Sequence, residues 1–197
     1  MPPPPPPEQI SEKTQHSRRY SLSEIWNDGR AVLRARWYFR KATQLGPKVR
    51  LWGRVAVQNY GTMIVGNRVR LVSTIVPIEL FVGSQGTLEI GEGCFINYGS
   101  SIAASQLVQI GPHCNIGTYV IMMDNDFHRI EPEHRKKMPP SKPIILEENV
   151  WLGARVTVLR GVTIGAGSVI GAGSVVTKDI PPRSLAVGLP ARVIKQI

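Results

Sequence analysis

A period of six residues runs through the second half of the chain and limits its fold more than any other feature. Large aliphatic side chains recur at this spacing, at Leu152, Val158, Ile164, Ile170 and Val176. Four residues after each of the first four stands a small or β-branched side chain, at Val156, Val162, Ser168 and Ser174. One large and one compact inward position in every six residues is typical of a hexapeptide β-helix, in which three hexapeptides complete one triangular coil. We therefore expect an elongated prism.

The same frame extends upstream with one irregularity. The large positions are Ile90, Ile96 and Ile102 and, after a slip of two residues, Ile110, Ile116 and Met122. The compact positions are Cys94, Ser100, Cys114 and Val120. A weaker copy begins near Val65 and Val69, and Val82 followed by Gly83 also fits the frame. The coils are therefore predicted to stack from about residue 50 onward.

The two cysteines and the start of the chain bear on its compartment. Cys94 and Cys114 should be stacked neighbours in adjacent coils, and we expect free thiols because stacked inward positions of a parallel sheet fit disulfide torsions poorly. The apolar runs are too short to span a bilayer, and Met1 is followed by six prolines rather than by an apolar signal region. We expect a cytoplasmic protein, with the inner membrane surface as an open alternative.

The N-terminal part predicts two segments before the prism. Residues 1–20 are Pro-rich and polar, and we expect a disordered arm. Residues 21–48 are predicted to hold an amphipathic helix, from about 22 to 44. Its signals are a capping box at Ser21 and Glu24, a helical spacing of Leu22, Trp26, Leu33 and Trp37, and a stop at Gly46 and Pro47.

Positive charge is concentrated in the same part of the chain. The whole sequence carries a net charge of +10, and residues 1–50 hold ten Lys or Arg against four Asp or Glu. A basic helix with an aromatic stripe suits peripheral contact with a membrane, or an acidic partner. The alternative is that the aromatic stripe packs on the end of the prism as a terminal cap.

The remaining residues, 49–197, are predicted to form one β-helix domain with a loop and a tail. Between Met122 and Val150 the six-residue rhythm stops, so we expect an extruded loop at 123–148, which contains two of the four histidines. In the tail, residues 177–197, three prolines should forbid further ladder pairing, so that the tail folds back or leaves.

The chain resembles the left-handed β-helix acyltransferases, and most of all the galactoside and maltose O-acetyltransferase group. The resemblance rests on the sequence NVWLGARVTVLRGVTIGAGSVIGAGSVVTKDIP at 149–181, on the ending VGLPARVIK, and on the Asn97 to His128 spacing. It implies an all-β, left-handed parallel β-helix, a homotrimer, acetyl-CoA as cosubstrate, and a saccharide or sugar-like hydroxyl as small-molecule acceptor.

The resemblance also assigns residues. His128 matches the general base of these enzymes, and Asn97 matches an acceptor-binding asparagine. The coenzyme A contacts of the group correspond to Ala154, Ala172, Thr177, Lys178, Arg192 and Lys195. Two substitutions in this chain concern the acceptor: Ala104 and Ser105 stand where the group has an acceptor-binding aspartate, and Arg129 replaces a proline.

The chemistry of the residues agrees with this assignment. Moving an acetyl group from a thioester to a hydroxyl requires a base that works near neutral pH, and histidine is the natural choice. His128, at the start of the interrupting loop, is the best placed of the four. Its imidazole could be oriented by Asp124, Asp126 or Glu131, or equally by a backbone carbonyl. The chain offers no Gly-x-Ser-x-Gly motif, and both cysteines have a packing role, so direct transfer in a ternary complex is expected.

Two other function classes fit parts of the sequence. A zinc carbonic anhydrase on the same β-helix would need three convergent histidines, for which His113, His128 and His134 are the candidates; a metal assay would distinguish it, and we expect no metal. A non-catalytic scaffold would have no affinity for coenzyme A. We expect no nucleic-acid binding, because the chain contains no recognised nucleic-acid module.

Overall fold

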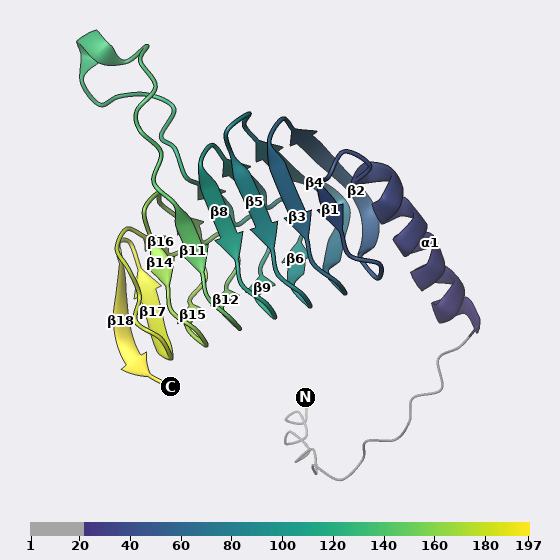
Figure 1. Ribbon diagram of the computed structural model, residues 1–197. Coiled ribbons are helices and arrows are strands. Elements are labelled where there is room, and N and C mark those ends of the chain that lie inside the picture. Colours follow the sequence, from purple (N-terminus) through teal and green to yellow (C-terminus); the bar gives the residue numbers. More distant parts are fainter. Residues whose placement is uncertain (1–21) are drawn as a thin grey trace, which may run out of the picture.

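The computed structural model describes residues 22–197, and over this range the chain is a left-handed parallel β-helix (Figure 1). One α-helix packs at the N-terminal end of the coils, and one long loop leaves the prism near its other end. The predicted fold class is confirmed. Within the described range, the chain has no helix with the length and apolar character needed to cross a bilayer.

The coils have three faces. The first face is a six-stranded sheet of β1 (Gln44–Leu45), β3 (Thr62–Val65), β5 (Thr87–Ile90), β8 (Leu107–Ile110), β11 (Ile144–Leu146) and β14 (Thr163–Ile164). The second face carries β6 (Phe95–Asn97), β9 (Asn115–Ile116), β12 (Trp151–Leu152), β15 (Val169–Ile170) and β17 (Ser184–Gly188). The third face carries β7 (Ser101–Ala104), β10 (Ile121–Met123), β13 (Thr157–Val158) and β16 (Val175–Val176).

Two long strands join the second and third faces into one sheet. β4 (Arg70–Val82) pairs with β6 through its first residues and with β7 through its last, and β2 (Arg50–Asn59) pairs with β4 along both parts. The coils therefore begin at about residue 50, as predicted, and β1 adds a short strand before them.

The inward positions are those of the six-residue frame. All the predicted large and compact positions from Ile90 to Val176 are at most 1% exposed. Hydrophobic burial along this single column is the main stabilising term, because each coil shields the next from water. The compact positions that carry polar groups bond to the next coil: Ser100 Oγ donates to the carbonyl of Gly117 over 3.0 Å.

The two-residue slip lies at one edge of the prism. The register pairs Ile96 with Ile116 but Leu152 with Ile170, so the earlier coil is two residues longer. The extra residues fall between β7 and β8, where the third face turns into the first. The long loop leaves from this same edge one coil later.

The cysteines are buried and free, as predicted. Each thiol donates to a backbone carbonyl of the next coil, Cys94 to Gly111 and Cys114 to Glu147, both over 3.1 Å. The neighbouring Cys114 side chain, together with burial, raises the pKa of the Cys94 thiol. Both residues thus act in packing.

The helix α1 spans Leu22–Tyr38 and ends before the predicted limit near residue 44. The chain leaves the helix early because the Thr43 N–H donates to the carbonyl of Met63, which begins the first face of the stack. Ala31 and Ala35 on one side of the helix, and Phe39 just after it, are buried against the prism, so the helix does cover the end of the coils. The aromatic stripe was predicted to make this contact, but Trp26 and Trp37 are exposed, because small alanine side chains let the helix approach the coils instead. Ser21 and the arm at residues 1–20 lie outside the described residues.

The tail corrects one prediction. β17 continues the parallel ladder of the second face by pairing with β15, and β18 (Ala191–Gln196) then folds back on it in antiparallel orientation. Ladder pairing therefore continues beyond Pro181 and Pro182. It can do so because these prolines stand in the turn between two faces, where the missing N–H removes no ladder bond.

Candidate functional site

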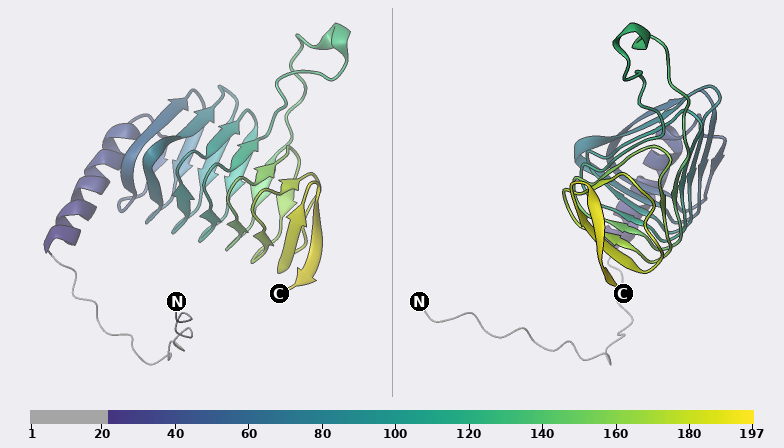
Figure 2. Two further views of the ribbon diagram at one scale, coloured as in Figure 1. Left: turned by 180° about the vertical axis from the view of Figure 1, so that it is seen from behind. Right: turned by 90° about the vertical axis from the view of Figure 1, so that its left-hand side faces the viewer.

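The long loop runs from residue 124 to 143, between β10 and β11, and contains one short 3-10 turn at Pro132–His134 (Figure 2). The predicted limits, 123–148, were too wide. Ile144 and Leu146 fill inward positions of the first face, and β11 pairs with both β8 and β14. Aliphatic alternation over three residues was too short a signal to separate this strand from the loop.

Asp124 fixes the first residue of the loop. Its carboxylate is fully buried and accepts three backbone N–H groups, from Ser105, Gln106 and Leu107, over 2.6 to 2.8 Å. The first two amides belong to the two-residue slip, and the third belongs to Leu107, the first residue of β8. The side chain of Asp124 is therefore committed to holding the edge of the prism.

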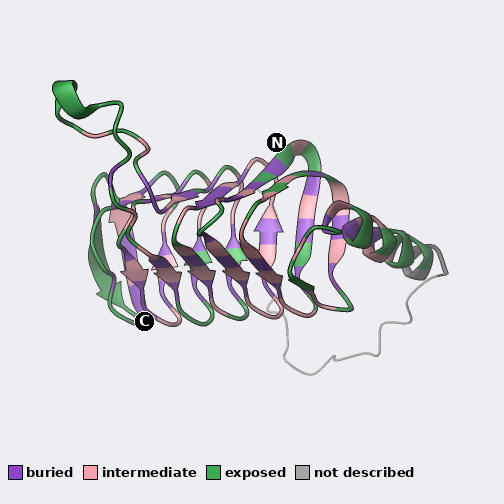
Figure 3. Cartoon of the chain, turned by 45° about the horizontal axis from the view of Figure 1, so that its top comes forward, coloured by how far each residue is buried: buried purple, intermediate pink, exposed green. Residues whose placement is uncertain are grey.

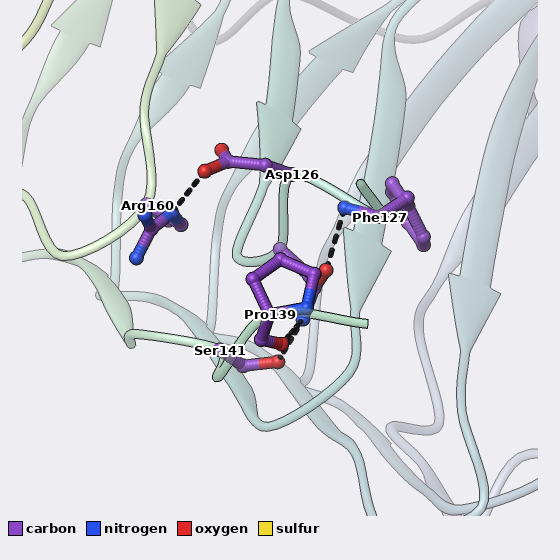
Figure 4. Close-up of polar contacts among 6 residues, drawn as sticks. Asp126, Phe127, Pro139, Ser141 and Arg160 are labelled. Atoms are coloured by element: carbon purple, nitrogen blue, oxygen red, sulfur yellow. Dashed lines mark hydrogen bonds and ion pairs between the residues drawn. The ribbon is translucent and has the colours of Figure 1, made fainter. Parts of the chain in front are cut away.

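Asn125 and Asp126 fasten the base of the loop (Figure 4). The Asn125 amide donates to the Pro139 carbonyl over 2.9 Å and to Ser141 Oγ over 2.8 Å, which joins the outgoing and returning limbs. The Asp126 carboxylate pairs with Arg160 Nε over 2.5 Å, which ties the loop to the turn after β13. Three consecutive side chains thus hold the segment that precedes His128.

His128 is presented by a tight turn. Its N–H donates to the carbonyl of Asp126 over 2.7 Å, and Phe127 between them has a φ of +59°. A bulky residue rarely adopts this left-handed backbone conformation, so the turn is strained and is held by the contacts of Asn125 and Asp126. Such strain is frequent where a functional side chain must point in one direction.

The imidazole of His128 is exposed, and its Nδ1 lies 3.1 Å from the backbone carbonyl of Arg135. Because a carbonyl can only accept, this contact assigns the proton to Nδ1 and leaves Nε2 with a free lone pair. Of the groups left open above, a backbone carbonyl orients the ring. Asp124 and Asp126 are bonded elsewhere.

Asn97 lies at the end of β6, on the edge between the second and third faces. It lines a surface hollow of about 420 Å³ with Phe95, Asn115 and Trp151. Its Oδ1 accepts the N–H of Tyr98 over 2.9 Å, so the amide nitrogen is oriented as a donor. The left-handed backbone position of this turn belongs to Gly99 rather than to Asn97.

The six residues assigned to coenzyme A fall on different parts of the prism. Ala154 and Ala172 occupy the turns after β12 and β15, on the same edge as Asn97, and the Ala154 carbonyl accepts the N–H of Gly173. Thr177 and Lys178 follow β16, on the edge from which the loop leaves. The remaining two, Arg192 and Lys195, lie on β18.

Lys178 and Arg192 come together. They line a hollow of about 290 Å³ between the tail hairpin and the last coil, although they are distant in the repeat frame. Lys195 is not among the residues of this hollow; it is exposed on β18, opposite Leu185. Two basic side chains beside one hollow can bind a phosphate group.

The predicted residues thus occupy two edges of the prism. Asn97, Ala154 and Ala172 lie where the second face meets the third, whereas His128, Thr177 and Lys178 lie where the third meets the first. Arg160 and Asn125 were not predicted from the sequence. A basic side chain at a turn position of the repeat, next to the interruption, was the available signal for Arg160.

Comparisons with known proteins agree with this geometry. The profile of the family described as "Hexapeptide repeat of succinyl-transferase" matches residues 143–178. A solved hexapeptide-repeat acetyltransferase from Vibrio cholerae is 31% identical, with a TM-score of 0.59, and the match covers 67% of this chain and 72% of that one. The chain belongs to the hexapeptide-repeat acyltransferases.

Two galactoside acetyltransferases also resemble this hexapeptide-repeat chain. That of Lactococcus lactis is 41% identical over 111 residues, which cover 56% of this chain and 53% of the relative. A solved galactoside acetyltransferase in complex with coenzyme A is 39% identical, with a TM-score of 0.56 and coverage of 66% and 64%. The chain spans just over half the length of the curated relative.

Proposed function

We propose that this protein is an acetyl-CoA-dependent O-acetyltransferase acting on a saccharide or sugar-like hydroxyl, with His128 as general base. The observation that carries the proposal is the state of the His128 ring: it is exposed, its Nδ1 is bonded to the Arg135 carbonyl, and its Nε2 has no hydrogen-bond partner among residues 22–197. The names of the galactoside acetyltransferase relatives support the hydroxyl acceptor.

In the proposed reaction, Nε2 of His128 removes the proton of the acceptor hydroxyl while its oxygen attacks the thioester carbonyl. The new C–O bond forms, the C–S bond breaks, and His128 returns the proton to the leaving sulfur. Between these two steps the ring is an imidazolium. The hydrogen bond from Nδ1–H to the Arg135 carbonyl is kept in this state and stabilises it, because a donor that carries positive charge makes the stronger hydrogen bond. Both thiols of the chain are buried, which supports direct transfer rather than an acyl-cysteine.

The chain has groups that suit coenzyme A. Lys178 and Arg192 would hold its phosphates in the hollow that they line. The exposed turns at Ala154 and Ala172 would contact it through backbone groups, because a methyl side chain leaves the backbone accessible. Asn97, whose amide nitrogen has no acceptor among the described residues, would contact the acceptor hydroxyl.

A complete site on this proposal needs more than one chain. Since Asn97 and His128 lie on different edges of the prism, side-by-side packing of three prisms would bring one edge of each chain to the other edge of its neighbour. We propose a homotrimer with three sites, each shared between two subunits.

Thiol release from acetyl-CoA, measured with a panel of free sugars, oligosaccharides and amino sugars, tests the activity. We expect release that depends on a hydroxyl acceptor. Faster release with amines than with hydroxyl acceptors would make the protein an N-acetyltransferase. No release above the uncatalysed rate with any acceptor, and no binding of coenzyme A by calorimetry, would favour the non-catalytic scaffold.

Mixed subunits test the shared site. Chains with His128→Ala and chains with Asn97→Ala should each be inactive alone but regain roughly a quarter of the wild-type activity when refolded together in equal amounts, because one interface in four then carries both intact residues. Light scattering controls for assembly. No recovery in mixed trimers, or an active monomer of the wild type, would contradict the proposal.

A further inference from the structure

The helix α1 presents an apolar stripe on the side opposite the prism. Trp26, Leu33 and Trp37 are 71%, 66% and 69% exposed, and their spacing of seven and four residues places them on one face. The opposite face buries Ala31 and Ala35 in the cap. The helix therefore has two apolar sides, of which only one is buried by the fold. In Figure 3, α1 is coloured mostly as exposed, with its buried positions next to the coils.

Basic side chains line this exposed stripe. Arg30 lies between Trp26 and Leu33 on the same face of the helix. Three more exposed basic residues lie beside the stripe or just beyond its C-terminal end: Arg36, Arg40 and Lys41. The Arg40 guanidinium stands 5.2 Å from the centroid of the Trp37 ring. Within the described part of α1, Asp28 is the acidic residue whose side chain can be placed, and it is paired with Arg50 over 3.3 Å.

We propose that α1 docks on the surface of an anionic membrane, lying in the plane of the interface with Trp26, Leu33 and Trp37 directed into it. Tryptophan favours the boundary between headgroups and acyl chains, and exposed arginines and lysines attract anionic headgroups. The two tryptophans are eleven residues apart, about 16 Å along the helix axis, so they would enter the interface together.

The position of Arg30 favours a lipid surface, rather than an apolar groove of another protein, as the partner of the exposed stripe. A groove that covered Trp26 and Leu33 would also bury the guanidinium between them, at a high cost in desolvation. At a lipid interface the aliphatic stem of Arg30 can lie along the apolar layer while its head reaches a phosphate. The opposite side of the helix is packed on the prism, so the docked protein would stand on its N-terminal end.

Sedimentation of the full chain with vesicles tests the proposal. We expect binding to vesicles of phosphatidylcholine with about a third phosphatidylserine, weak binding to pure phosphatidylcholine, and loss of binding in high salt. Replacing Arg30, Arg36 and Lys41 by Gln should lower the partition coefficient on the order of a hundredfold. Lys48→Gln, Arg54→Gln and Lys137→Gln together change the net charge equally and should have a much smaller effect.

The apolar contribution has its own variant. Trp26→Ser, Leu33→Ser and Trp37→Ser together should lower the partition coefficient at least about tenfold, whereas Ile75→Ser, at a residue 70% exposed on β4, should not. Equal binding of wild type and both helix variants to anionic vesicles would overturn the proposal. So would self-association through the stripe, seen as a concentration-dependent mass that these serines abolish, or binding to acidic polypeptide but not to vesicles.

Discussion

The prism and the loop at 124–143 are built on different principles. In the prism, each inward side chain repeats the one a coil earlier, and parallel ladders connect every coil to the next. In the loop most side chains are exposed. The side chains of Asp124 and Asp126 bond its outgoing limb to the prism, and Asn125 joins this limb to the returning one.

The difference shows where a repeat protein can accommodate a catalytic side chain. A position that recurs in every coil is constrained by packing above and below it, so it cannot easily hold a unique polar group. A single interruption escapes this constraint, but it must then be fastened by side chains of its own. The strained turn that presents His128 stands directly after that fastened segment.

The largest expected effect separates the two regions by stability. Leu152→Ala, inside the prism, should lower the free energy of unfolding by about 3 kcal/mol or more, because the fully buried isopropyl end of the side chain is lost and a cavity remains. Ile130→Ala, at a loop residue 86% exposed, should change it by less than about 0.5 kcal/mol. Urea unfolding at one fixed protein concentration measures both. A large cost at Ile130 would mean that the loop packs against something in solution.

The second prediction separates them by chemistry. His128→Ala should lower turnover at least about a hundredfold while leaving the unfolding midpoint and coenzyme A affinity unchanged, because a positioned base contributes this much and the ring stabilises no packing. Acetyl transfer under saturating acetyl-CoA is the measurement. Near-normal turnover in a folded variant would place the base elsewhere.

The third prediction concerns the joint between the two regions. Asp124→Asn should cost about 2 kcal/mol, since the amide cannot accept all three N–H groups of Ser105, Gln106 and Leu107. The rate of amide hydrogen exchange should increase more at those three amides than at other amides of the prism. Asp126→Asn is the matched control. Equal exchange rates of the three amides in both variants would contradict the role assigned to Asp124.

The smallest effect is expected at Arg160, which we assign as a positioning residue for His128 through Asp126. Arg160→Gln should lower turnover about tenfold with little change in the Michaelis constant for acetyl-CoA, and with stability nearly unchanged because a partly exposed ion pair contributes little. Arg160→Lys should restore most of the turnover, since the charge that pairs with Asp126 returns. A change in stability without a change in turnover would make the pair merely structural.

The repeat frame could be predicted in detail because the spacing of large aliphatic and compact residues along the sequence shows its period directly. Every large and compact position from Ile90 to Val176 proved to be buried, and the slip after Ile102 was placed in the correct coil. The boundaries were less accurate: the helix ends at Tyr38, and Ile144–Leu146 is a strand inside the predicted loop. Ends are decided by single hydrogen bonds, such as that of Thr43 with Met63, which no periodicity encodes.

The sequence by itself determined the prism, the inward residues, the free thiols and the place where the repeat breaks, because all of these follow from local spacing. Only the tertiary structure decided which carbonyl orients His128, that Asp124 satisfies the amides of the slip, and that Lys178 and Arg192 line one hollow. Each of these contacts joins residues from different turns or coils. Which residues become partners depends on which loops and coils the folded chain places side by side. The period of the repeat does not specify these neighbours.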